Sequence, residues 1–136
     1  MARGGRRGRH ASATRRFSQP VLVAIRDGKI LGIRAGVRPH RFIAVWAVVV
    51  NGRVFVRSWN DKPRGWYRAF LEEPRGTIEI AGRELRVRAK AARGEHLLDA
   101  IDRAYREKYN TPGSRRFVRG FAGARRRRTT TELVPR

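Results

Sequence analysis

The segment from Phe42 to Trp59 constrains the fold of this chain more than any other. Phe42–Val50 is an almost unbroken apolar run, Asn51-Gly52 is a residue pair typical of type I′ turns, and Val54–Trp59 runs back. An apolar strand of this kind is covered on both faces, as in the wall of a barrel or the core of a sandwich. The segment therefore predicts an antiparallel hairpin at the centre of a β-rich fold.

Two further turn sequences, Asp27-Gly28 and Ala81-Gly82, predict two more hairpins. The β-branched run Val21–Arg26 precedes the first turn and suits a strand. Around the second turn, apolar and basic side chains alternate, which is typical of an antiparallel strand with one solvated face. The strands predicted beside these turns are residues 21–26, 30–34, 78–80 and 85–90.

Two segments have helical spacing instead. Asn60–Pro63 resembles a helix start, and the stripe of Trp66, Tyr67, Phe70 and Leu71 follows it. The second predicted helix begins at Gly94 or Glu95 and continues to Tyr109, with apolar residues three or four positions apart. The charged residues expected on the outer surface of this second helix are Asp102, Arg106 and Lys108.

These elements predict one mainly β (α+β) domain, a small antiparallel barrel or sandwich with two helices. The domain is expected to cover residues 18–136, with a basic segment at 114–128 and a final strand at 129–134. Residues 1–17 are expected to form a disordered basic tail, because they are rich in glycine and arginine.

The charge of the chain is unevenly distributed. The formal net charge is +22, of which residues 1–20 carry +6 and residues 114–136 carry +7. Arginine-rich segments of this kind are typical of proteins that bind nucleic acid through its phosphates. The residues expected to do so are Arg125, Arg126, Arg127 and Arg128, together with the N-terminal tail.

The residue inventory argues against several kinds of site. The chain has no cysteine, and its three histidines lie far apart in the sequence, so we expect neither a disulfide nor a metal centre. No spacing suggests a Ser–His–acid triad or a phosphate-binding glycine loop, so we expect no catalytic residue. No apolar run is long enough for a membrane span or a secretory leader, and we expect a cytoplasmic protein.

Five short motifs, in order along the chain, carry a resemblance to a known family. They are Phe55–Trp59, Gly65–Ala69, Gly76–Ile78, Ala104–Tyr109 and Thr130–Pro135. The set resembles an uncharacterised bacterial family that is similar to the deazaflavin-dependent nitroreductases. It is more distantly similar to the split barrels of the pyridoxamine 5′-phosphate oxidase type.

The resemblance implies a split β-barrel, often a homodimer, with FMN or a deazaflavin bound at the dimer interface. It departs from the nitroreductases in two loops, residues 34–41 and 60–62, where their phosphate-binding glycine motifs are replaced or reduced. The first of these loops, residues 34–41, is basic. This loop and Lys62 are expected to face a cofactor phosphate, because arginine offers phosphate a planar pair of donors. The residues expected to line the cofactor site are Arg38, His40, Arg41, Arg57, Ser58, Trp59, Lys62 and Trp66.

Each of these positions also has a structural interpretation. Arg57 shares a face of its strand with Phe55 and Trp59, where an arginine either faces a cleft or extends over the barrel wall to solvent. Tryptophans at helical spacing, such as Trp66, commonly belong to a core. Three functions therefore remain open: an oxidoreductase that binds a flavin-type cofactor and a small-molecule substrate, a nucleic-acid-binding protein, and a cofactor-free dimeric barrel.

Overall fold

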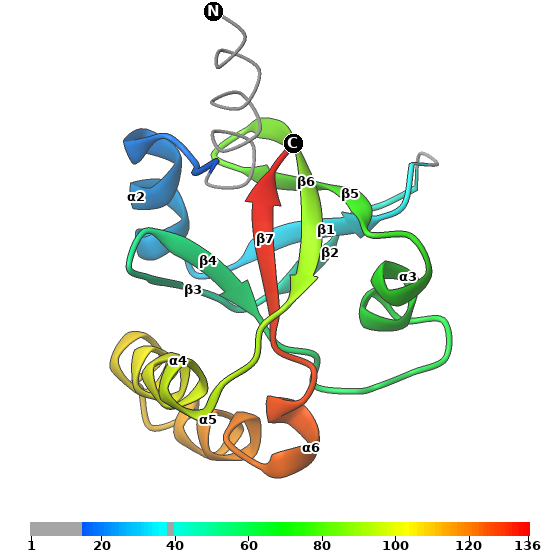
Figure 1. The fold of residues 1–136 in the computed structure, drawn as a ribbon. Helices are drawn as coiled ribbons and strands as arrows, with labels where there is room; N and C mark the ends of the chain where they lie inside the picture. The colour runs from blue at the N-terminus through cyan, green and yellow to red at the C-terminus, as the bar shows by residue number, and fades with distance from the viewer. Residues whose placement is uncertain (1–14, 38–39) are drawn as a thin grey trace, which may run out of the picture.

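A sheet of seven antiparallel strands, curled into a nearly closed barrel, forms the centre of the computed structural model, which describes residues 15–37 and 40–136 (Figure 1). The strands follow one another across the sheet in the order β2-β1-β5-β6-β7-β4-β3. Their bounds are β1 Leu31–Ala35, β2 Ile43–Val45, β3 Ala47–Val50, β4 Arg53–Val56, β5 Arg75–Ile80, β6 Arg83–Ala91 and β7 Thr131–Pro135. The predicted mainly β, antiparallel barrel is confirmed.

The barrel closes through a bend at Trp46. Strands β2 and β3 lie at opposite ends of the strand order, yet only Trp46 separates them in the chain. The predicted continuous strand Phe42–Val50 is therefore two strands, one at each edge of the sheet. A single apolar segment thus supplies both edges, and little sheet edge is left unpaired.

Two of the three predicted hairpins, those at Asn51-Gly52 and Ala81-Gly82, form as predicted. Asn51 and Gly52 have φ values of 53° and 74°, and Ala81 and Gly82 have 52° and 74°. Positive φ at both central residues defines a type I′ turn and matches the twist of the flanking strands.

The prediction of a strand at residues 21–26 is wrong, because this segment lies in the helix α2, Gln19–Asp27. Val21 and Ile25, four residues apart, are both buried against the barrel interior, and this packing outweighs the strand preference of β-branched residues. Gly28 has φ −75°, so Asp27-Gly28 is not a type I′ turn. Phe17, placed by the sequence in a tail, is buried in the same core, and the tail residues 1–14 lie outside the described residues.

Five helices surround the barrel in the described residues, rather than two. The predicted second helix is confirmed as α4, Glu95–Lys108, and the predicted first helix begins later than expected, as α3, Trp66–Glu72. Leu71 is 60% exposed instead of packing with the rest of its predicted stripe. The basic segment 114–128 contains two short helices, α5 (Arg115–Phe121), which buries Val118 and Phe121, and α6 (Ala124–Arg127), which has no buried residue.

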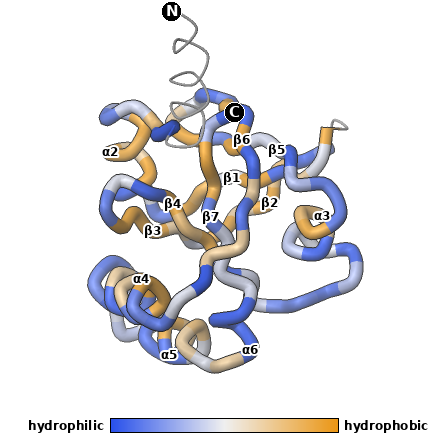
Figure 2. Tube along the Cα trace, viewed as in Figure 1, coloured by the Kyte–Doolittle hydropathy of each residue, from blue (hydrophilic) through white to orange (hydrophobic). Residues whose placement is uncertain are grey.

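Two hydrophobic clusters lie on opposite faces of strand β4. Val54 and Val56 belong to the cluster inside the barrel, whereas Phe55 belongs to a second cluster under α4 and α5. The alternation predicted for this strand is therefore present. Figure 2 shows β3, which also contributes to both clusters, as hydrophobic along its length, whereas hydrophilic colour appears on β6. The layer outside β4 is where the candidate site lies.

Candidate functional site

A cavity of about 460 Å³ lies beside the bend between β2 and β3. One wall is the strand segment Ile43–Trp46, a second is the loop that follows β4, and the third is α5. All three tryptophans of the chain line it, together with two phenylalanines of α5: Trp46, Trp59, Trp66, Phe117 and Phe121. The cavity is thus mainly aromatic.

The aromatic rings of the cavity are held by close packing. Trp59 meets Phe117 and Phe121 edge to face, with ring centroids 5.3 and 5.4 Å apart. A Cβ at Gly120 would lie 2.5 Å from the Trp59 ring, so α5 approaches this ring only because position 120 is glycine. Trp46 stacks on Tyr109 at 4.1 Å, with the ring planes 4° apart. These contacts fix two indole rings in the cavity wall.

Arg126 covers one face of the Trp59 ring. Its guanidinium carbon lies 3.6 Å from the ring centroid, and its Nε donates a hydrogen bond of 2.9 Å to the Trp59 carbonyl. The sequence assigned Arg126 to a phosphate-binding tail, but the structure places it on a folded segment at the edge of the cavity.

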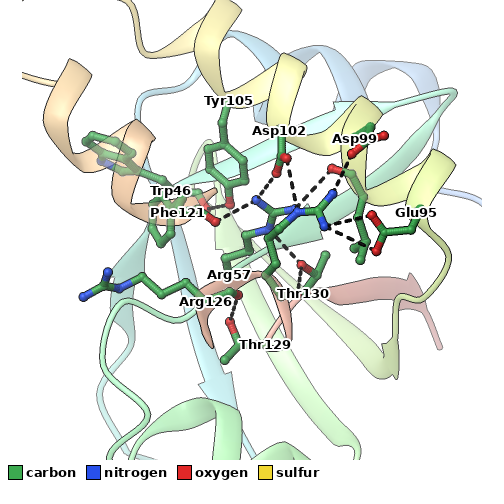
Figure 3. Close-up of polar contacts among 12 residues, drawn as sticks. Trp46, Arg57, Glu95, Asp99, Asp102, Tyr105, Phe121, Arg126, Thr129 and Thr130 are labelled. Atoms are coloured by element: carbon green, nitrogen blue, oxygen red, sulfur yellow. Dashed lines mark hydrogen bonds and ion pairs between the residues drawn. The ribbon is translucent and has the colours of Figure 1, made fainter. Parts of the chain in front are cut away.

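The guanidinium of Arg57 is enclosed by protein groups (Figure 3). Its side chain is 0% exposed, and its Nη1 lies 2.5 Å from Asp102 Oδ1. It also donates to Thr130 Oγ1 and to the carbonyl oxygens of Phe121 and Leu98, over distances of 2.8 to 3.3 Å. Arg57 therefore joins the end of strand β4 to α4, α5 and the start of β7, and its side chain forms part of the cavity wall without exposure to solvent.

Arg127 completes this polar layer from the other side of Asp102. It lies 3.2 Å from Asp102 Oδ2 through its Nε, 2.7 Å from Asp99 and 3.2 Å from Glu95. The prediction that Asp102 lies on the outer face of its helix is therefore wrong, because its carboxylate is shared by two inward-facing arginines. Neutralised in this way by three carboxylates, Arg127 offers little charge to an external anion.

Consecutive threonines close the same layer. Thr129 Oγ1 and Thr130 Oγ1 donate to the carbonyls of Arg126 and Arg127, over 2.7 and 2.6 Å, and so satisfy the end of α6. Thr129 Oγ1 also accepts from the Ser58 backbone N–H at 2.9 Å. The sequence explained these threonines by strand preference alone, whereas their hydroxyl groups organise the turn into β7.

Lys108, expected on a helix surface, is half-buried. Its Nζ donates to the carbonyls of Ile25 and Ala47, over 2.8 and 2.6 Å, and thereby joins α4 to the end of α2 and to β3. Burial lowers the pKa of Lys108 to about 8. Tyr109 beside it has its pKa raised by burial to about 12. This end of α4 is therefore a structural junction. The spacing of residues in the sequence did not indicate it, because Lys108 occupies a position that would equally suit a solvated helix face.

The structure brings together five of the eight residues predicted for the cofactor site. Those that line the cavity are Arg57, Ser58, Trp59, Lys62 and Trp66. His40 and Arg41 do not line it: the His40 ring lies 3.0 Å from the Ala35 carbonyl oxygen in an exposed loop. Arg38 lies outside the described residues. The sequence missed Trp46, Phe117 and Phe121, which strand and helix packing bring to the same cavity.

The fold and this aromatic cavity define a small antiparallel barrel of the split-barrel-like class. Residues 22–133 match a family described as an uncharacterized protein conserved in bacteria (DUF2255), and the chain belongs to that family. The expected membership in an uncharacterised bacterial family is thus confirmed. No curated protein matches the chain.

The fold is similar to a crystal structure of the conserved hypothetical protein Rv2991 from Mycobacterium tuberculosis. The TM-score is 0.59 at 15% sequence identity, and the match covers 91% of this chain and 84% of that chain. At this identity the likeness concerns the fold alone. In the described part of the chain, we find no helix with the length and apolarity that a membrane crossing requires.

Proposed function

We propose that the protein binds a flavin-type cofactor, FMN or a deazaflavin, in the aromatic cavity and acts as an oxidoreductase on a small molecule. The observation that carries this proposal is the convergence of all three tryptophans on one cavity. A bound cofactor of this kind would supply hydride transfer, while the chain binds it, orients it and excludes water.

The dimensions and lining of the cavity fit this class of ligand. Its volume of about 460 Å³ falls within the range of about 300–1,000 Å³ that is usual for small-molecule sites. Planar rings pack well against indole side chains, and both Trp59, in the loop after β4, and Trp66, at the start of α3, line the cavity. The Arg57 guanidinium is satisfied by protein groups, so it shapes the cavity wall and is not expected to grip the cofactor.

Two cations remain suitable for the phosphate of the ligand. Lys62 lines the cavity and is exposed, and Arg126 uses only its Nε for the Trp59 carbonyl. The loop of His40 and Arg41, expected to hold the phosphate, does not contribute to the cavity. We therefore assign the phosphate to Lys62 and Arg126.

The exposed apolar part of the cavity wall favours a dimer of this chain in the cofactor-bound state. Ile43 is 44% exposed and Phe117 is 37% exposed, and both line the cavity. A second copy lying over them would shield a bound ring from water. Light scattering with and without FMN tests this point, and a monomer in both conditions would contradict it.

The test of cofactor binding uses the intrinsic fluorescence of the protein. Because every tryptophan lines the cavity, a bound flavin ring should quench most of the emission in a saturable way. Nuclease-treated protein is titrated with FMN, riboflavin and a deazaflavin at low and at high salt. Saturable quenching that survives high salt supports a formed site, because screening weakens nonspecific attraction of an anion to arginines. Absence of quenching at both salt concentrations would contradict the proposal.

A pair of variants separates ring binding from phosphate binding. Arg126→Gln should weaken FMN binding by about tenfold, the lower end for a charge-assisted hydrogen bond, and leave riboflavin binding nearly unchanged. Arg125→Gln is the matched control, because Arg125 is exposed on the same short helix, whereas Arg126 packs on the cavity-lining Trp59. Equal effects of the two variants would show that only net charge matters.

A further inference from the structure

The outward face of strand β6 is a row of cations. Arg86, Arg88 and Lys90 are exposed, while Val87 between them is fully buried in the barrel. In Figure 1 no helix lies in front of β6 and β7. The outer face of β6 is therefore presented to solvent, whereas Glu132 on the neighbouring β7 is buried.

Arginines on this face lie next to other arginines. Arg88 is directly opposite Arg75 of β5, and Arg136 donates its backbone N–H to the Arg86 carbonyl at 3.0 Å. Like charges opposite one another on neighbouring strands destabilise a sheet. Glu73, which pairs with Arg75, offsets part of this repulsion, and an anionic partner would offset the remainder.

Glu79 and Glu84 face one another at the turn end of β5 and β6, and two other carboxylates near the row of cations are held by arginines outside it. Glu73 holds Arg75 at 2.7 Å, and Glu132, which is opposite Lys90, holds Arg53 at 2.8 Å. Within the described ranges, no ion pair involves Arg86, Arg88 or Lys90. Their charge is available to a molecule outside the chain.

This availability contrasts with the basic run expected to bind nucleic acid. Within Arg125–Arg128, Arg127 is held by three carboxylates and Arg126 packs on Trp59. Half of that run is therefore engaged inside the protein. The sheet, by contrast, carries three exposed cations in a row on one strand, none of them in an ion pair of the described residues.

We propose that the outward face of β5, β6 and β7 binds the phosphate backbone of a nucleic acid duplex. Alternate residues along a strand stand about 6.6–6.8 Å apart, so Arg86, Arg88 and Lys90 form a row of cations at that spacing along β6. The outward positions of these three strands carry no aromatic side chain on which an unpaired base could stack. Binding through phosphates alone positions a duplex without selecting its sequence.

The experiment measures fluorescence anisotropy of a labelled DNA duplex of about 20 base pairs, two helical turns, titrated with the full chain. The face variant is R86Q/R88Q/K90Q. The control variant is R103Q/R106Q/R119Q, which has the same net charge and changes exposed arginines of α4 and α5. The face variant should bind at least about tenfold more weakly, and the control should remain within about threefold of the unmodified protein.

The salt dependence provides a second readout. Removal of three phosphate contacts should reduce the slope of log K against log salt by about 2.7. Equal losses in the two variants, or no loss in the face variant, would overturn the proposal. The face variant should bind flavin as tightly as the unmodified protein, because none of its three substituted residues lines the cavity. Failure of the nucleic-acid proposal therefore leaves the cofactor proposal unaffected, and the reverse also holds.

Discussion

Arginines serve opposite purposes in two regions of this molecule. In the layer between β4 and helices α4 to α6, Arg57 and Arg127 share one carboxylate, Asp102, and their remaining donors meet carbonyl, hydroxyl or carboxylate oxygens. On the outward face of β6, Arg86 and Arg88 are exposed and lie beside other arginines. The first group holds the fold together, and the second presents charge.

The difference lies in what stands across from each guanidinium. An enclosed arginine is tolerated only with partners that compensate its loss of water, whereas an exposed one needs none. The net charge of the chain therefore says little about where an anion binds. The location of the few carboxylates decides it.

The largest expected effect comes from Arg57→Leu. This change leaves Thr130 and the Phe121 carbonyl without their partner, and it should lower the free energy of unfolding by about 3 kcal/mol. Urea denaturation followed by circular dichroism measures the change. The matched variant Arg103→Leu alters an exposed arginine on α4 and should stay within about 0.5 kcal/mol. Similar losses in both would remove the contrast between the two regions.

The variant Lys108→Met tests the comparison through the pH dependence of the free energy of unfolding. Burial lowers the pKa of Lys108 to about 8, against its ordinary 10.5, so between these values the unfolded chain binds a proton that the folded chain has released. Stability therefore rises with pH from 8 to 10 in the unmodified protein, and this rise should be lost in the variant. Lys90→Met, which changes an exposed lysine, should keep it. Urea denaturation at several pH values between 8 and 9 keeps the tyrosines, whose ordinary pKa is about 10, largely protonated.

The smallest expected effect is a gain. Arg88→Thr removes a positive charge opposite Arg75 and places a β-branched residue in an exposed strand, which should raise stability by about 0.5 kcal/mol. The part due to charge should vanish in high salt. A loss in low salt would mean that Glu73, which is paired with Arg75, stabilises Arg88 as well.

The sequence predicted the elements whose local pattern and tertiary packing agree. The hairpin has the turn residues Asn51-Gly52, and the helix Glu95–Lys108 has apolar residues at helical spacing. Each of the two elements also has a buried face. Helix α2 was missed because β-branched residues suggested a strand, although Val21 and Ile25 also have the i, i+4 spacing of a helix. In that segment, packing against the barrel end decides between two local patterns of similar strength.

The candidate site was predicted only in part for a related reason. Trp59, Lys62 and Trp66 are close in the chain, so one loop identifies them together. Phe117 and Phe121 reach the cavity from a helix some 50 residues later in the chain, which spacing does not indicate. The partners of Arg57 and Lys108 are largely side-chain and backbone oxygens on distant elements, so only the three-dimensional arrangement distinguishes these residues from solvated charges.

The position of β7 has a consequence for how the chain matures during synthesis. Thr131–Pro135 follows the other six strands of this sheet in the sequence, yet it lies in the interior of the sheet between β6 and β4. Until it emerges from the ribosome, the nascent chain holds two separate half-sheets, each with an unpaired inner edge open to mispairing. The barrel therefore cannot close before residues 131–135 have left the ribosome, and a chain cut before residue 131 would keep those edges exposed.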